Sequence, residues 1–368
     1  MRSERDVMRL LYRGRRVFAV GHGCAPEWND TASETTDLIR TEVMPSFEIA
    51  PIYPTKLPTV DLNMERLAGD DQLSIRSGED LAASYAAWIK ELDCAVEAED
   101  GIPTDLLPAA RENIARAKRC LDRMRVGIQH LRENPDARLA FSLMNRAMMM
   151  QQRHYAISTT PRVWSQSGNA LKLDRRYESP RYRDTDNAWR PFQFAFVLLN
   201  IVGMVDPSHA DREIVDVIWF PTGGGKTEAY LGLSAFTILW RRLRQPQDSG
   251  TVVLMRYTLR LLTTQQYQRA ASLICALEYL RRRDTNRLGN EPISIGLWVG
   301  GSVTPNRETY AKQALIEMAS KGNSENRFVL VSCPWCGAGM GAYAFRRAYR
   351  VVGYRTLPSL GRVAHICD

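Results

Sequence analysis

The stretch IWFPTGGGKTEAYLG, residues 218–232, places three glycines, a lysine and a threonine between an apolar run and a helical pattern. Glycines permit positive φ angles and let backbone N–H groups approach a phosphate, and a helix start adds further unpaired N–H groups. Lys226 would then reach the terminal phosphates, and Thr227 would place its hydroxyl on Mg²⁺. The sequence therefore predicts a phosphate-binding loop; a glycine-rich turn without a ligand is the alternative.

The spacing of this loop indicates which kind of phosphate loop it is. The eight-residue pattern requires a glycine six residues before the lysine, but Phe220 occupies that position. Residues 221–227 instead fit the shorter form that helicases use. We predict that ATP and Mg²⁺ bind here, with Lys226 and Thr227 in the catalytic role. The loop residues predicted to contact the nucleotide are Thr222, Gly223, Gly224, Gly225, Lys226, Thr227 and Glu228.

Short apolar runs alternate with helical patterns around the loop. The runs are residues 213–220, 251–256, 293–301 and 327–333, and helices are expected at 227–244, 260–283 and near 306–320. Continuous apolar runs are typical of buried parallel strands, and strand–helix alternation indicates right-handed crossovers. The predicted fold class is α/β: a RecA-like P-loop parallel sheet, incomplete in this chain, preceded by a mainly α-helical N-terminal domain.

Helical periodicity dominates residues 78–155. One helix is expected near the start of this segment, a second after Pro103, and a third over roughly 136–155. The second carries a strict seven-residue apolar repeat, formed by Leu107, Ala110, Ile114, Ala117, Leu121, Met124, Ile128 and Leu131. A helical hairpin or bundle packed on itself is favoured, and a partner-binding coiled coil is the alternative.

Changes of composition divide the chain into four expected parts. These are an N-terminal mixed, mainly helical domain (1–156), a basic linker (157–188), a first, incomplete RecA-like helicase domain (189–332) and an incomplete zinc-ribbon-like insertion (333–368). The linker is polar and basic, with interspersed aromatics. A solvated segment is favoured, and nucleic-acid contact is the alternative, through Arg175, Arg176, Tyr177, Arg181, Tyr182 and Arg183.

The bulk composition excludes some classes of protein. The chain has 368 residues, 45% of them hydrophobic, which is ordinary for a globular protein. No apolar run reaches the roughly 18 residues of a membrane span, and the basic N-terminus lacks the apolar core of a signal peptide. A cytoplasmic protein without a membrane partner is expected. The net charge of +8 is compatible with a nucleic-acid partner but does not establish one.

Two neighbours of the loop resemble segments of superfamily 2 helicases. WRPFQ (189–193) resembles their adenine-recognition segment, in which a glutamine bonds both adenine edges; Gln193 fits that role, supported by Arg190 and Phe192. RYTLRLLTTQQYQRA (256–270) resembles the segment that grips one nucleic-acid strand. An ordinary helix start is the alternative for each. The predicted nucleic-acid contacts are Thr258, Arg260, Thr263, Thr264 and Gln265.

Seven cysteines are scattered along the chain, and only the last three have suggestive spacing. Cys333-Pro-Trp-Cys336-Gly has the form of a zinc knuckle, with two thiolates spaced to bind one tetrahedral ion. Cys367 lies where a second knuckle would begin. These three residues are the predicted metal ligands, with His365 as a less favoured fourth. A redox pair is the alternative, but nothing thioredoxin-like surrounds the motif.

Taken together, several segments resemble the helicase of bacterial DISARM anti-phage systems, the DrmA type. They are FAVGHGC (18–24), WRPFQFAFVLLN (189–200), residues 217–244 around the loop, LMRYTLRLLTTQQYQRA (254–270), GLWVGGSVTPNR (296–307) and CPWCG (333–337). The resemblance implies an ATP-dependent superfamily 2 DNA helicase or translocase that handles phage DNA. It also implies two partners, a second helicase-like subunit and a DNA methyltransferase. The cysteine spacing itself predicts Zn²⁺ in the full-length protein.

The chain also departs from that family. Its members are far longer, and neither an Asp-Glu motif nor a second RecA-like domain that supplies an arginine is recognisable here. We therefore expect an N-terminal fragment or truncated product that binds nucleotide weakly and does not hydrolyse it. Two alternatives remain open: the translocase subunit of a restriction system, and a non-catalytic DNA-binding scaffold with a relic P-loop.

Overall fold

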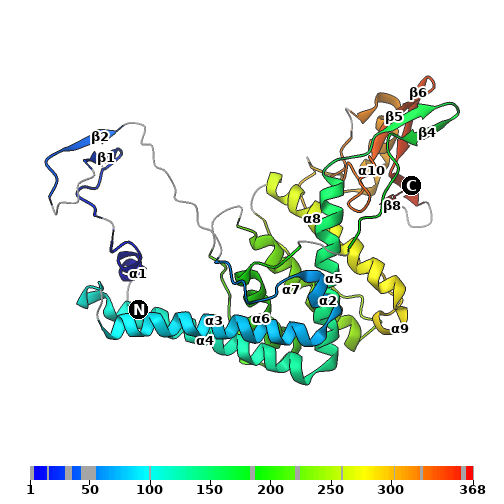
Figure 1. Cartoon of the computed structure of the whole chain (residues 1–368). Coiled ribbons are helices and arrows are strands. Elements are labelled where there is room, and N and C mark those ends of the chain that lie inside the picture. The colour runs from blue at the N-terminus through cyan, green and yellow to red at the C-terminus, as the bar shows by residue number, and fades with distance from the viewer. Residues whose placement is uncertain are drawn as a thin grey trace.

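The computed structural model describes residues 4–14, 16–29, 35–42, 55–98, 101–182, 187–219, 224–257, 260–301, 303–323, 326–357 and 362–367. Helices dominate this part of the chain (Figure 1). They are α1 (Glu4–Leu11), α2 (Met64–Gly69), α3 (Asp71–Glu97), α4 (Leu107–Glu133), α5 (Pro135–Ser158), α6 (Pro191–Val205), α7 (Lys226–Arg244), α8 (Arg260–Arg283), α9 (Thr285–Leu288) and α10 (Glu308–Lys321), with 3-10 turns η1 (Thr104–Leu106) and η2 (Ala210–Glu213).

The strands are short, and within the described residues they pair only as antiparallel two-stranded sheets. The pairs are β1 (Ala25–Trp28) with β2 (Ile39–Glu42), β3 (Trp164–Ser167) with β4 (Ala170–Leu173), β5 (Gly341–Phe345) with β6 (Ala348–Val352), and β7 (Tyr354–Leu357) with β8 (Arg362–His365). The β1–β2 hairpin lies apart from the helical body, whereas the last two hairpins lie beside α10 (Figure 1).

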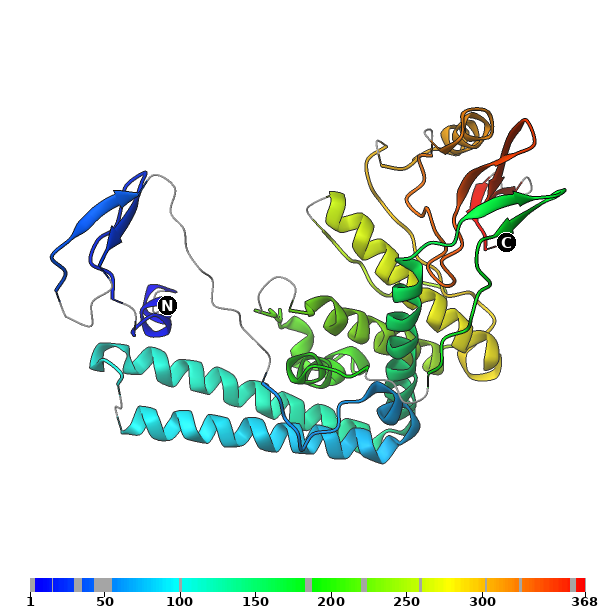
Figure 2. The ribbon, with the colours of Figure 1, turned by 45° about the horizontal axis from the view of Figure 1, so that its top comes forward.

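The three helices expected between residues 78 and 155 are confirmed as α3, α4 and α5. Polar side chains fix where two of these helices begin. The Asp70 carboxylate caps α3 by accepting from N–H groups of its first turn. Asn134 caps α5 in the same way, and Pro135 follows at the first helical position, where its missing N–H has no cost. The long helices α3 and α4 lie side by side as a hairpin (Figure 2).

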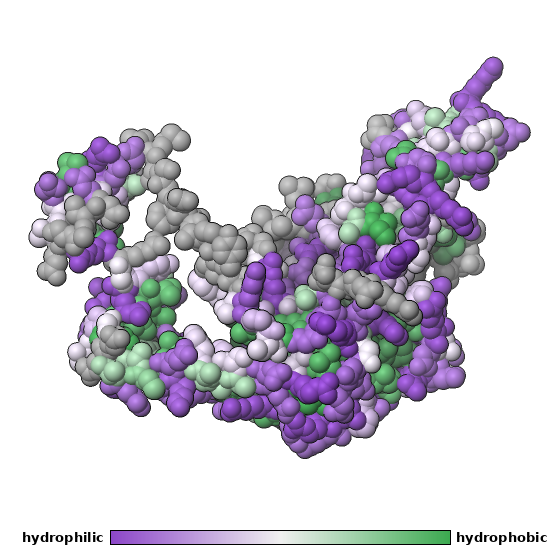
Figure 3. Space-filling view, viewed as in Figure 1, coloured by the Kyte–Doolittle hydropathy of each residue, from purple (hydrophilic) through white to green (hydrophobic). Residues whose placement is uncertain are grey.

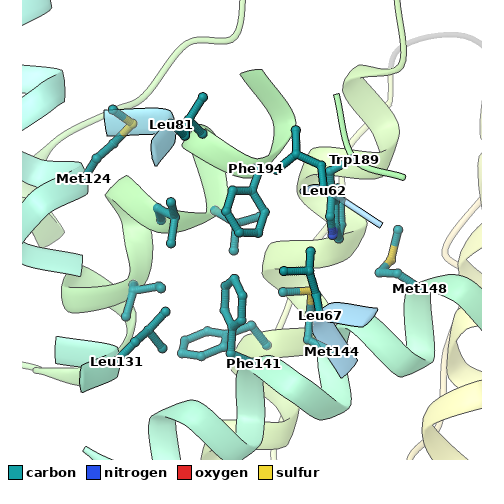
Figure 4. Close-up of a cluster of buried hydrophobic side chains, with 14 of the residues drawn as sticks. Leu62, Leu67, Leu81, Met124, Leu131, Phe141, Met144, Met148, Trp189 and Phe194 are labelled. Carbon is teal, nitrogen blue, oxygen red and sulfur yellow. The ribbon is translucent and has the colours of Figure 1, made fainter. Parts of the chain in front are cut away.

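The main core lies where α4, α5, α6 and α7 meet. Phe141 of α5 points toward Phe194 of α6, with ring centroids 5.7 Å apart, and it lies 6.4 Å from Phe236 of α7. Leu131, Met144 and other apolar side chains surround these rings (Figure 4). Seven of the eight residues in the repeat of α4 are buried, and Ala117 is half-buried, so the repeat does form the inner face of that helix.

The predicted parallel sheet is wrong. Among the described residues the apolar runs at 214–219, 251–256, 293–300 and 327–331 form no strand, although the helices expected between them are present as α7, α8 and α10. Val215 and Val217 are 87% and 80% exposed, and Trp298 is fully exposed. A buried parallel strand requires hydrogen-bonded neighbours and covered faces, and no described strand lies beside these runs. The fold class is mostly helical with small antiparallel hairpins.

The surface is that of a polar protein. Hydrophilic residues cover most of the helical body on the face drawn in Figure 3, with apolar residues showing between them. Of the helices that the structure describes, none has both the length and the apolar character required to cross a bilayer.

The carboxylate of Glu278 ties α8 to the segment that follows α9. It accepts hydrogen bonds from the guanidinium groups of Arg281 and Arg282 and, at 3.0 Å, from the N–H of Ile293. Burial raises the pKa of Glu278, but these hydrogen bonds outweigh it and lower the pKa from 4.5 to about 2. The charged form is therefore the one that stabilises this junction.

A lowered pKa predicts a specific loss of stability in acid. The stabilisation from Glu278 should be complete above about pH 4.5 and should disappear as the pH falls toward 2. We expect the difference in free energy of unfolding between the wild type and Glu278→Gln to shrink across that window in urea titrations. Glu112→Gln, which alters an exposed carboxylate on α4, is the control. A difference that stays constant with pH would exclude the Glu278 carboxylate as its source.

Candidate nucleotide-binding loop and cysteine cluster

The end of the glycine loop has a backbone that only glycine adopts readily. Gly225 precedes α7 with φ of 84°, in the left-handed region. A Cβ at this position would lie 2.6 Å from Nε2 of Gln193 and 3.3 Å from Oε2 of Glu228. Glycine has no side chain to cap α7, so the N–H groups of its first turn and the positive end of the helix dipole face the loop.

Two residues at the start of α6 hold this loop. The Gln193 side chain donates from Nε2 to the carbonyl oxygen of Gly225 at 2.7 Å and accepts from the Arg190 N–H at 2.8 Å. The Arg190 guanidinium donates to the carbonyl oxygen of Gly224. Gln193 is buried. The structure therefore brings together the WRPFQ segment and the loop, and both ends of the Gln193 amide are engaged with backbone groups.

The first residues of α7 combine a cation, a hydroxyl and a carboxylate. Lys226 and Thr227 are half-buried, and the Thr227 hydroxyl makes no hydrogen bond to any residue that the structure describes. Glu228 pairs through Oε1 with Arg269 of α8. Its other oxygen, Oε2, is buried and has no hydrogen-bond partner in the described part of the chain. Such an atom is costly to leave unpaired unless a ligand or a cation completes it.

The structure describes the other predicted nucleotide- and nucleic-acid-binding residues only in part. Thr222, Gly223 and Thr258 lie outside the described residues. Arg260, Thr263 and Thr264 lie in the first turns of α8, but their side chains are not described, and Gln265 is exposed on the same helix. Arg269 was missed by sequence reasoning, because its partner Glu228 lies on another helix and no local pattern signals that pair.

The three late cysteines form one cluster. Their sulfur atoms all lie within 4.8 Å of one another, and the Sγ atoms of Cys336 and Cys367 are 3.3 Å apart. Thiolates bound to one zinc at about 2.3 Å would lie about 3.8 Å apart in a tetrahedron, so the donor set fits such an ion. Hydrogen bonds from Cys333 and Cys367 lower the pKa of Cys336, and the same contacts raise the pKa of Cys333 and of Cys367, so a single thiolate is shared within the cluster. These residues could hold a metal ion such as zinc.

The predicted knuckle turn has its local hydrogen bonds in place. The Gly337 N–H donates to the Cys333 carbonyl at 2.9 Å, and the Trp335 N–H donates to the Cys333 sulfur at 3.4 Å. Gly337 has a φ of 70°, and a Cβ there would lie 2.9 Å from the carbonyl oxygen of Ile157. His365 is not part of the cluster among the described residues; its ring packs edge-on against Phe328 and Tyr354.

Two groups that sequence reasoning missed support the knuckle from outside. Arg162 is buried, donates from Nε to the Cys336 carbonyl at 2.9 Å, and pairs by its backbone with Gly337 and Gly339. His154 of α5 stacks on Trp335 with ring centroids 3.4 Å apart. Its Nδ1 lies 2.6 Å from the Trp335 carbonyl, which can only accept, so Nδ1 carries the proton.

The fold and these two sites define a mostly helical protein with a glycine-lysine-threonine helix start and a metal-type cysteine cluster. No protein-family model matches the sequence. The chain is a homologue of the DISARM protein DrmA of Bacillus paralicheniformis, with 35% identity over 374 residues of alignment. The alignment covers 94% of this chain and 31% of that protein. The predicted relationship to DrmA is therefore confirmed.

Proposed function

We propose that this chain provides the ATP-binding part of a DNA helicase or translocase in a bacterial DISARM anti-phage system. The relationship to DrmA supports the defence role, and the loop before α7 supports the nucleotide. DNA, a second helicase-like subunit and a DNA methyltransferase of the same system would be its partners. A cytoplasmic location is consistent with that role.

The observation that carries this proposal is the constellation around Gly225. A left-handed glycine, an uncapped helix start and Lys226 lie at one point, held there by Arg190 and Gln193. Backbone amides, a helix dipole and an ammonium group are the features that bind a polyphosphate.

The residues present also fit the magnesium ion that accompanies ATP. Mg²⁺ takes hard oxygen ligands and keeps several waters, and the Thr227 hydroxyl and Glu228 Oε2 are two oxygens without a hydrogen-bond partner in the described part of the chain. Bound there, the ion would neutralise phosphate charge. We propose that Thr227 contributes directly and that Glu228 contributes directly or through water, while Arg269 fixes the Glu228 carboxylate.

Removal of the Lys226 ammonium should abolish most nucleotide binding. We expect Lys226→Ala to weaken binding of a fluorescent ATP analogue at least about tenfold, since a charge-assisted contact to phosphate is worth about 1.5–3 kcal/mol. Fluorescence titration with Mg²⁺ present provides the measurement. Lys172→Ala, which removes the same charge from β4, is the matched control and should bind like the wild type.

This experiment also separates the proposed function from its alternative. If Lys226→Ala and the wild type bind the analogue equally, the loop is a relic and a DNA-binding scaffold is the better description. We expect binding without turnover in this chain, because no Asp-Glu pair that could activate water is recognisable in its sequence. Sustained ATP hydrolysis that Lys226→Ala abolishes would contradict that expectation.

A further inference from the structure

A cavity of about 820 Å³ lies where α2, α5 and α8 meet the segment at residues 181–182, and two of its lining residues contact His154 and Trp335 beside the cysteine knuckle. Its floor is apolar and includes Leu143, Met149 and Leu280. Two tyrosines, Tyr182 and Tyr279, form part of its wall. This volume is within the range of small-ligand pockets, which combine an apolar lining with a few polar groups.

Three arginines surround the cavity, each from a different segment of the chain. Arg146 lies in α5 and Arg283 at the end of α8. Arg181 lies in the connection between β4 and α6. All three are exposed, and none of their guanidinium groups forms an ion pair with a carboxylate that the structure describes. The carboxylates of Glu65 and Asp284 also line the cavity, so the three guanidiniums leave it with an excess of positive charge, which favours an anionic ligand.

The aromatic wall is fixed before any ligand arrives. The Tyr182 hydroxyl donates to Nε2 of His154 at 2.5 Å, because Nδ1 of that ring already carries the proton. Tyr279 packs against Trp335 with ring centroids 5.5 Å apart, and the Arg283 guanidinium lies 3.9 Å from the Tyr279 ring centroid. A flat ligand can therefore find an ordered aromatic and guanidinium surface here.

We propose that this cavity binds an unpaired stretch of nucleic acid, with a base against the stacked Arg283 and Tyr279 side chains and phosphates at Arg146, Arg181 and Arg283. Single-strand sites combine positive charge along the backbone with aromatic rings beside the bases. A duplex hides its bases from such a recess, so the unpaired strand is favoured. The inference rests on the proposed function in one respect: it assumes that the chain handles DNA.

The test is fluorescence anisotropy with a labelled oligothymidylate of about 12 nucleotides, without ATP, at several salt concentrations. We expect the triple variant Arg146→Ala, Arg181→Ala and Arg283→Ala to bind at least about thirtyfold more weakly at low salt, with a salt slope smaller by about 2. Tyr279→Leu should weaken binding about tenfold with an unchanged slope. Arg283→Lys should retain the wild-type slope, because it keeps the charge.

A triple variant with the same charge change provides the control. Arg76→Ala, Arg116→Ala and Arg125→Ala remove three exposed guanidiniums from α3 and α4, which are paired with acidic residues. This control should bind within about threefold of the wild type, and thermal unfolding should show both triple variants folded. Equal weakening by the two triple variants would mean that net charge, not the cavity, binds the strand, and the inference would be wrong.

Two competition arms identify the ligand. Unlabelled duplex of the same length should compete far less well than the unpaired strand; equal competition would overturn the proposal. If the cavity variants instead lose binding of the ATP analogue and keep the strand, the cavity is a site for free nucleotide. Lys226→Ala should retain strand binding, because Lys226 does not line the cavity. Loss of ATP-analogue binding therefore tests the proposed function, and loss of strand binding tests the cavity. A wild-type chain that binds no strand overturns this inference alone.

Discussion

Gly127→Ala should destabilise the protein by about 2–3 kcal/mol, although the same change in an open helix stabilises by about 1 kcal/mol. Gly127 lies inside α4, and a Cβ at this position would lie 2.0 Å from the carbonyl oxygen of Leu198 in α6. The neighbour is helical backbone and cannot rotate away. The two helices would have to move apart, although both pack into the core at this contact.

The consequence should extend to the loop before α7. Leu198 and Ile201 of α6 are fully buried, so a displaced α6 leaves gaps around Phe194 (Figure 4). The same helix begins with the two side chains that hold Gly224 and Gly225. We therefore expect Gly127→Ala to weaken binding of the ATP analogue as well, by a smaller factor than Lys226→Ala.

Urea unfolding and the analogue titration measure the two effects. Gly203→Ala is the matched control, because Gly203 lies in α6 and its added Cβ would meet its nearest neighbours at 3.6 Å, an ordinary contact. That variant should unfold at the same or slightly higher urea concentration than the wild type. If the two glycine variants were equally stable, α4 and α6 would not be as closely packed as described.

The helices were predictable because the information that specifies them is local. The seven-residue repeat of α4 fixes its buried face, and caps such as Asn134 fix where the next helix begins. The sheet was not predictable, because an apolar run fixes only a tendency toward an extended backbone. Whether Val215 or Leu254 becomes part of a strand depends on neighbouring strands, and among the described residues these runs have none.

In the candidate site, too, the sequence predicted what short segments specify and missed what depends on tertiary packing. Sequence alone brought Gln193 and the glycine loop into one hypothesis, through a resemblance that covered both segments. It did not show that the Gln193 amide holds the Gly225 carbonyl oxygen, since that contact depends on how α6 packs against α7. Nor did it indicate the Glu228–Arg269 pair, which joins residues of two different helices. Tertiary pairs of this kind leave no periodic signal.

The cysteine cluster is the clearest case of a site predicted from spacing. Two thiolates in a knuckle and a third near residue 367 were expected to share an ion, and the three sulfurs do lie together. The support from Arg162 and His154 was not expected, because both residues lie more than 170 residues before the knuckle in the sequence. A metal in the cluster would therefore be linked to α5 through Trp335.

Zinc content should depend on Cys336 more strongly than on any cysteine outside the cluster. We expect the wild type, purified under reducing conditions, to carry about one zinc ion per chain, and Cys336→Ser to carry almost none. The three thiolates of the cluster supply most of the binding energy for the ion. In Cys336→Ser only Cys333 and Cys367 remain, and two thiolates are too few to hold it. Metal analysis by mass spectrometry gives the content, and titration with a competing chelator gives the affinity.

The same variant should loosen the contact between the knuckle and α5. Without a metal, the Cys333–Gly337 turn loses its anchor, and the stack of Trp335 on His154 loses one of its supports. Amide hydrogen exchange of residues 333–340 should therefore become faster in Cys336→Ser, while α3 and α4 stay protected. Exchange that is unchanged in this segment would show that Arg162 and His154 alone hold the turn.

Two control variants make the zinc result specific. Cys94→Ser removes an exposed thiol from α3 and should keep the full zinc content. His365→Ala should also keep its zinc, because that ring packs on Phe328 and Tyr354 and is not part of the sulfur cluster. A wild type without zinc, or equal zinc in Cys94→Ser and Cys336→Ser, would mean that the three sulfurs lie together for a reason other than a metal ion.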